Sequence, residues 1–73
     1  MILMSYNEEQ LYYACMNFCK HFFRYMCKRN EYHNALRLGA DFEEREAMMR
    51  QEQKPLQHAF EKLQEAIKIV GEE

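Results

Sequence analysis

The sequence has few of the residues that β-sheets and tight turns need. Its 73 residues include two glycines, one proline, one valine, three isoleucines and no threonine. Strands favour β-branched residues and need turn residues between them. Glu, Gln, Leu, Met, Ala, Lys and Arg are abundant instead, and these are good helix formers. The composition therefore excludes a β-sheet fold and predicts an all-α protein.

Disorder and a multidomain architecture are excluded on other grounds. Apolar residues make up 48% of the chain and aromatic residues 14%, which is more than a disordered segment carries. A chain of this length forms one domain at most, and it buries only about 60% of the surface that its unfolded form exposes. We expect a single helical domain over residues 1–73.

Cysteine usage and hydropathy indicate where the protein acts. The three cysteines at positions 15, 19 and 27 are an odd, closely spaced set, whereas a small secreted protein usually carries an even set. The N-terminal Met-Ile-Leu-Met is too short for a signal peptide. The apolar stretch from Leu11 ends at Lys20, before the roughly 20 residues that a membrane span needs. We predict a cytoplasmic protein that does not bind a membrane.

Capping signals predict a first helix over about residues 6–38. Ser5-Tyr6-Asn7-Glu8 matches the S-x-x-E capping box, in which the glutamate reaches back to the serine amide. Gly39 is the first residue suited to the left-handed backbone that ends many helices. The sequence leaves open a break near Asn30, because asparagine is a good N-cap.

After a turn at residues 39–41, a second helix is predicted over about residues 42–70. Asp41 and Glu44 have the spacing of an N-cap and its third helical residue. Pro55 interrupts this segment, because proline removes a backbone hydrogen bond and clashes with the carbonyl four residues earlier. The predicted architecture is a helical hairpin whose second helix is kinked or split at Pro55.

The predicted first helix has more apolar surface than the rest of the chain can cover. Eight of the ten aromatic residues lie in residues 6–32, and the second helix offers one good partner face. A helix apolar on most sides is normally buried. We therefore predict a homodimer or a higher oligomer, with two hairpins forming a four-helix bundle. The predicted oligomer core is Leu11, Cys15, Phe18, Phe22 and Tyr25, and a second apolar stripe beside it comprises Tyr12, Met16, Cys19, Phe23 and Met26.

A polar strip runs along the same helix. Its members recur with helical spacing: Tyr13, Asn17, Lys20, Arg24 and Lys28. Such a strip can hold an acidic patch of a partner protein, or it can contact phosphates while its tyrosine stacks on bases. It can equally be the solvated side of a buried helix that pairs with the acids at positions 43, 44 and 46 of a neighbouring chain.

Neither a metal site nor an active site is predicted. Zinc needs four converging donors, whereas Cys15 and His21 point to different sides of a helix. The sequence contains no H-E-x-x-H, no G-x-S-x-G, no glycine-rich phosphate loop and no di-iron E-x-x-H pair. We expect a protein that is not an enzyme and that binds no cofactor.

The last predicted helix resembles one known family. Residues 56–67 have the spacing L-Q-x-small-F-x-x-L-x-x-A-I, which is similar to the C-terminal helix of a phage family of cyclic-nucleotide sponges that counter CBASS defence. The resemblance implies a small helical oligomer that binds a cyclic nucleotide between its subunits. The N-terminal tyrosine-arginine-leucine signature of that family is absent here, so no ligand-binding residue carries over.

These patterns predict a non-enzymatic helical interaction protein that binds and blocks a larger protein partner. A virus-encoded inhibitor of a host system is one form of this function. The alternative is an oligomeric, anti-defence sponge that sequesters an anionic nucleotide. A third reading is a nucleic-acid-binding regulator, although such proteins are usually basic and this chain has a net charge of −2.

Overall fold

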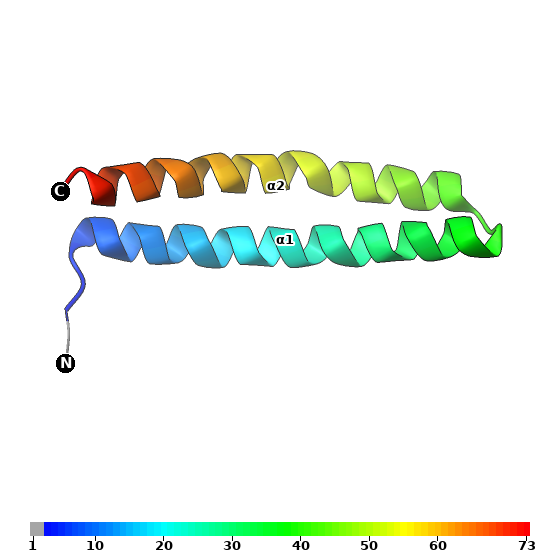
Figure 1. Ribbon diagram of the computed structural model, residues 1–73, viewed down its shortest axis with the longest axis horizontal. Coiled ribbons are helices and arrows are strands. Elements are labelled where there is room, and N and C mark those ends of the chain that lie inside the picture. Colours follow the sequence, from blue (N-terminus) through cyan, green and yellow to red (C-terminus); the bar gives the residue numbers. More distant parts are fainter. Residues whose placement is uncertain (1–2) are drawn as a thin grey trace.

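Two antiparallel helices of similar length make up the hairpin, α1 (Tyr6–Leu38) and α2 (Phe42–Gly71), as Figure 1 shows. The computed structural model describes residues 3–73, and within that range there is no strand. The all-α class and the hairpin are thus confirmed for this range; Met1 and Ile2 of the predicted domain lie outside it. The hairpin measures 52 × 24 × 13 Å. Its radius of gyration is 16.5 Å, compared with about 11 Å for a compact domain of this length.

The first helix begins at the predicted capping box. The hydroxyl oxygen of Ser5 accepts a hydrogen bond from the backbone amide of Glu8 at 3.2 Å. The same hydroxyl donates to Oε1 of Glu8 at 3.2 Å, so the carboxylate meets the serine side chain instead of the expected serine amide. The helix then continues without interruption to Leu38, and the break considered near Asn30 is not formed.

Gly39 ends α1 in the predicted left-handed conformation, with a φ of 68°. The backbone amide of Gly39 donates to the carbonyl of Leu36 at 3.3 Å, and that of Ala40 donates to the carbonyl of Ala35 at 2.9 Å. These two bonds form a Schellman motif, which satisfies carbonyl groups that a helix end leaves free. The chain therefore reverses within three residues.

The second helix differs from its prediction at Asp41, and at Pro55 it excludes one of the two predicted alternatives. Asp41 occupies the N-cap, but its side chain makes no capping hydrogen bond, so the predicted bond is wrong although the predicted helix start is right. Pro55 lies inside a helix that continues on both sides of it, so the chain is not split there. The helix extends to Gly71, one residue beyond the predicted end.

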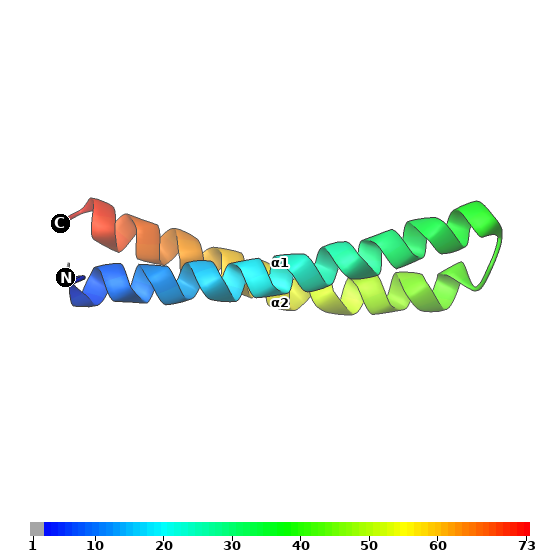
Figure 2. The same ribbon diagram turned by 90° about the horizontal axis from the view of Figure 1, so that it is seen from below.

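Most of the side chains that are shielded from solvent lie on a seam between the helices, at alternating steps of four and three residues. A repeat of 3.5 residues is that of a left-handed coiled coil, and the two ribbons cross in Figure 2. Within residues 3–73, only Ala35 and Ala59 are buried, so one hairpin alone has a small core. The seam consists of Asn7, Leu11, Ala14, Phe18, His21, Tyr25, Lys28, Tyr32 and Ala35 from α1, with Met49, Glu52, Leu56, Ala59, Leu63, Ala66 and Val70 from α2.

Two contacts across the seam establish the register of the helices. The ring centroids of Phe18 and Phe60 are 5.7 Å apart. Nearer the turn, Nη1 of Arg45 lies 3.3 Å from Oε2 of Glu31. Because the helices run in opposite directions, residues near the N-terminus of α1 lie level with residues near the C-terminus of α2. His21 occupies the middle of this seam, and its Nδ1 is buried without a hydrogen-bond partner among the described residues.

Candidate functional site

The hairpin divides the predicted oligomer core into two groups. Leu11, Phe18 and Tyr25 recur every seven residues and lie half-buried in the seam. Cys15 and Phe22 occupy the next position around α1 and are exposed. Three of the five predicted core residues are therefore used within the chain, and two remain available for contact with another molecule.

An open aromatic groove lies on the side of the hairpin that carries Phe22. The ring of Phe18 stacks against that of Phe22 at 5.8 Å, and it contacts Phe60 across the seam. Phe22 and Phe60 remain 46% and 45% exposed. The groove is therefore apolar surface shared by both helices, lined by Phe18, Phe22, Tyr25, Gln53, Leu56, Gln57 and Phe60.

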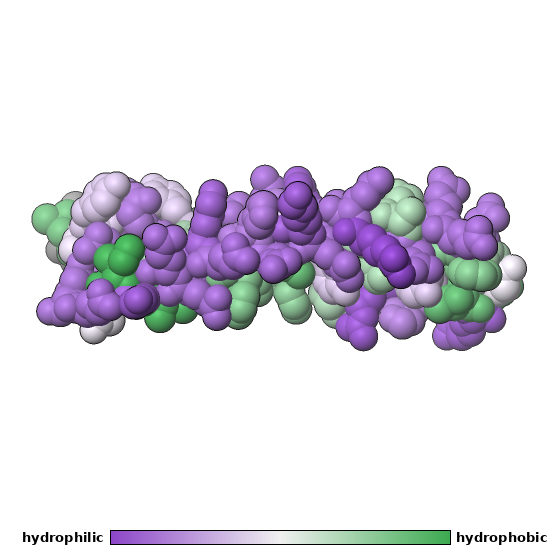
Figure 3. All heavy atoms as spheres, turned by 90° about the horizontal axis from the view of Figure 1, so that it is seen from above, coloured by the Kyte–Doolittle hydropathy of each residue, from purple (hydrophilic) through white to green (hydrophobic). Residues whose placement is uncertain are grey.

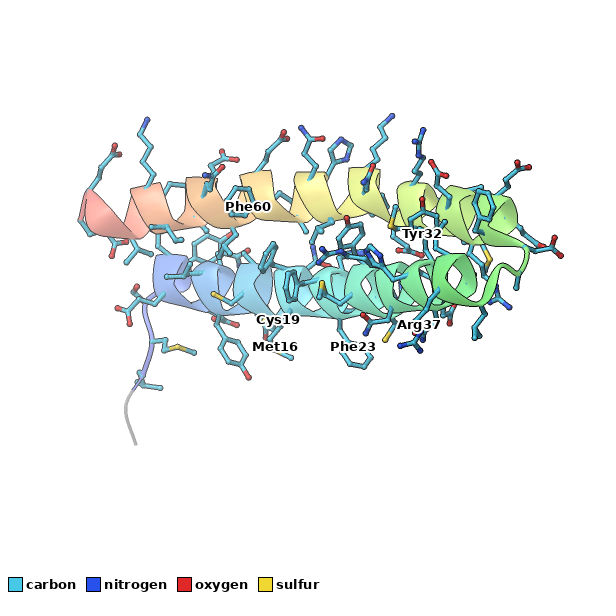
Figure 4. All side chains as sticks on the ribbon, turned by 45° about the vertical axis from the view of Figure 1, so that its right-hand side comes forward. Met16, Cys19, Phe23, Tyr32, Arg37 and Phe60 are labelled. Carbon is cyan, nitrogen blue, oxygen red and sulfur yellow. The ribbon has the colours of Figure 1, made fainter. Side chains whose placement is uncertain are left out.

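A larger apolar surface covers the side of α1 that faces away from α2. We call it the outer stripe: Tyr12, Met16, Cys19, Phe23 and Met26. In Figure 4, Met16, Cys19 and Phe23 lie on this side of the helix. Met16 is 53% exposed and Phe23 is 69% exposed. Tyr12 and Cys19 are exposed as well, whereas Met26 is half-buried. Most of the outer stripe is therefore apolar surface that no residue within 3–73 covers.

The corresponding side of α2 is polar. Figure 3 views the molecule from this side, where hydrophilic residues predominate. Its exposed residues include Gln51, Lys54, Gln57, His58, Glu61, Gln64 and Lys68. An amphipathic helix that packs along one stripe has this pattern. The two helices therefore differ, because α2 has one apolar side whereas α1 has two.

The predicted polar strip is exposed at four of its five positions. Tyr13, Asn17, Lys20 and Arg24 lie on the flank of α1 away from the aromatic groove. Lys28 instead lies in the seam, where its Nζ is 3.7 Å from Oε2 of Glu31. Two consecutive steps of four residues, from 20 to 24 and from 24 to 28, turn position 28 around the helix toward α2.

A shallow hollow borders this strip at the open end of the hairpin. Its volume is about 420 Å³, and its walls combine aromatic rings, amides, one ammonium group and one carboxylate. Sequence reasoning found Tyr13 but missed Tyr6 and Lys62, because these two are brought together only by the register of the helices. The lining residues are Tyr6, Asn7, Gln10, Tyr13, Ala14, Lys62, Glu65, Ala66 and Ile69.

Within residues 3–73, no group of three or more His, Cys, Asp or Glu side chains is placed to hold a metal ion. Cys15, Cys19 and Cys27 are free thiols. In this part of the chain, neither helix has an apolar stretch long enough to cross a bilayer.

Comparison of the chain with protein-family models, curated proteins and solved structures gives no match. The resemblance of residues 56–67 to the cyclic-nucleotide sponges therefore rests on that segment alone. No residue takes a role from a relative, so the exposed surfaces of α1 are the features from which a function can be argued.

Proposed function

We propose that this chain is a non-enzymatic helical interaction protein that forms a homodimer and binds and blocks a larger protein partner. The observation that carries the proposal is its excess of exposed surface. The accessible surface is 6002 Å², whereas a compact monomer of the same mass exposes about 4,900 Å². The difference, about 1,100 Å², is more than the roughly 800 Å² that each partner buries in an interface of standard size.

The polar strip is the surface proposed to contact the larger partner. Within residues 3–73, neither Lys20 nor Arg24 forms an ion pair. Their charges are therefore free to meet acidic groups of another protein, while Tyr13 and Asn17 supply neighbouring hydrogen-bonding groups. Charge complementarity of this kind directs association and selects the partner. The hairpin, once bound, then blocks the partner by covering its surface.

Charge reversal tests this assignment. The double variant Lys20→Glu, Arg24→Glu alters two exposed residues, so we expect the helices to remain folded and partner binding to fall at least tenfold. Lys54→Glu, Lys68→Glu is the matched control, because it makes the same change in net charge on the polar side of α2. Affinity capture followed by titration of the captured protein measures partner binding by both variants. Equal binding by the wild type and both variants would show that the strip is only a solvated surface.

Nucleotide sequestration is a second candidate, which the hollow at the open end of the hairpin favours. Tyr6 and Tyr13 offer aromatic faces for a base, and Lys62 offers a cation for a phosphate. Native mass spectrometry of freshly purified protein tests this directly. A nucleotide adds several hundred daltons per site, and Lys62→Glu is expected to remove that mass. A protein without added mass or absorbance near 260 nm contradicts this candidate.

A further inference from the structure

We infer that a second copy of this chain covers the outer stripe of α1, with the two α1 helices antiparallel and a two-fold axis at Cys19. The inference rests on the proposed homodimer. It names the contact face and the direction of packing, which the proposal leaves open. It also replaces the predicted oligomer core, because the seam already uses three of those five residues.

The spacing of the outer stripe suits packing against itself. Its five residues follow steps of four, three, four and three, which is the repeat of two helices that pack along their length. Long side chains lie about one turn and about two turns from Cys19 in both directions, so a two-fold axis there brings each of them within about one residue of the level of another. Tyr12 then meets Met26 of the second copy, and Met16 meets Phe23 of the second copy. Both are contacts between a thioether and an aromatic ring, which are favourable.

The charges beside the stripe select the antiparallel direction. On the flank next to the aromatic groove, α1 carries Glu8, Cys15, Phe22 and Arg29 at intervals of seven residues, all exposed. An antiparallel pair brings Glu8 within about one residue of the level of Arg29 of the second copy, and Cys15 within about one residue of the level of Phe22 of the second copy. A parallel pair would instead set this flank against the opposite flank of the second copy, which carries Tyr13, Lys20 and Cys27, and would lose the pairing of Glu8 with Arg29.

The opposite flank of the stripe tolerates the same arrangement. There the two Lys20 side chains come to similar levels. Lys20 is exposed, and a lysine can lay its methylene stem along apolar surface while its ammonium group stays in water. The antiparallel pair therefore keeps Lys20 in contact with solvent and leaves the polar strip open on both copies.

Single-cysteine cross-linking tests both the face and the direction. Three double variants each keep one thiol. The Cys19 variant carries Cys15→Ser and Cys27→Ser, and the Cys15 variant carries Cys19→Ser and Cys27→Ser. The Cys27 variant carries Cys15→Ser and Cys19→Ser. Under copper-phenanthroline oxidation, we expect most of the Cys19 variant to form a disulfide-linked dimer. The other two should form at least tenfold less, because Cys15 lies about 12 Å and Cys27 about 24 Å along the axis from its own copy. Equal cross-linking of Cys15 and Cys19, or none at Cys19, overturns the inference.

Substitution of Phe23 gives an independent readout of the same face. Phe23 is 69% exposed in one hairpin, so Phe23→Glu is expected to leave the helices intact while dimer affinity falls at least tenfold. His58→Glu on the polar side of α2 is the matched control and should leave the dimer unchanged. Sedimentation measures the dimer affinity, and circular dichroism measures the helix content.

The outcomes separate this inference from the proposed function. A dimer that survives Phe23→Glu and lacks the Cys19 cross-link overturns the proposed face but keeps the homodimer. A wild-type protein that is monomeric at micromolar concentration overturns both. Binding of the larger partner through Lys20 and Arg24 is measured separately and is unaffected by either result.

Discussion

Gly39 adopts a positive φ at the one turn of the hairpin, and a Cβ placed there would meet no atom within 4 Å. The effect of Gly39→Ala should therefore come from the backbone alone. Alanine in a left-handed conformation costs about 1–2 kcal/mol, so we expect the free energy of unfolding to fall by that amount in urea titrations. Gly71→Ala is the matched control, because its Cβ is equally unobstructed and its φ is not positive. Equal losses at both glycines would contradict this account.

His21 is a second position where one residue has a measurable effect. Its buried Nδ1 lacks a hydrogen-bond partner among the described residues, and such an atom costs about 1–3 kcal/mol. Leucine is apolar and is also the better helix former. We expect His21→Leu to raise the free energy of unfolding by about 1 kcal/mol or more. Thermal unfolding followed by circular dichroism measures this, with the exposed His58→Leu as control. A less stable His21→Leu protein would mean that the imidazole makes a favourable contact in the seam.

At the scale of the helices, α2 continues through Pro55. A proline inside a helix removes the hydrogen bond to the carbonyl four residues earlier, at Gln51. Gln51 is exposed, so water can supply the missing donor. We expect Pro55→Ala to restore the bond and to stabilise the protein by about 1–3 kcal/mol in urea unfolding. The neighbouring Lys54→Ala is the control. A loss of stability in Pro55→Ala would indicate that the proline shapes α2 to fit α1.

At the scale of the whole molecule, the hairpin has too small a core to be strongly stable alone. Only Ala35 and Ala59 are buried within residues 3–73. If a homodimer supplies the missing burial, mass action requires the unfolding midpoint to rise with protein concentration. We expect this rise for the wild type and its absence for Phe23→Glu. A midpoint independent of concentration for both proteins would contradict dimerisation. Differential scanning calorimetry over a series of concentrations makes the measurement.

The amino-acid sequence by itself determined the all-α class, the ends of α1 and the position of the turn. Ser5 and Gly39 act through hydrogen bonds to residues at most four positions away, so local pattern was enough to predict them. Asp41 and Pro55 show the limit of such signals. Asp41 lies at the N-cap of α2, although its side chain makes no capping hydrogen bond. Pro55 does not end α2, because residues before and after it, such as Met49 and Leu63, are half-buried in the seam with α1.

Only the tertiary structure decided which side of α1 is covered. Leu11 and Cys15 share one helix face by their spacing, yet the 3.5-residue repeat of two packed helices leaves the first half-buried and the second exposed. Tyr6 and Lys62 meet at one hollow although they are far apart in the chain. Both results depend on the register between the helices, which is set by long-range contacts such as that of Phe18 with Phe60. A periodic pattern within one helix contains no information about that register.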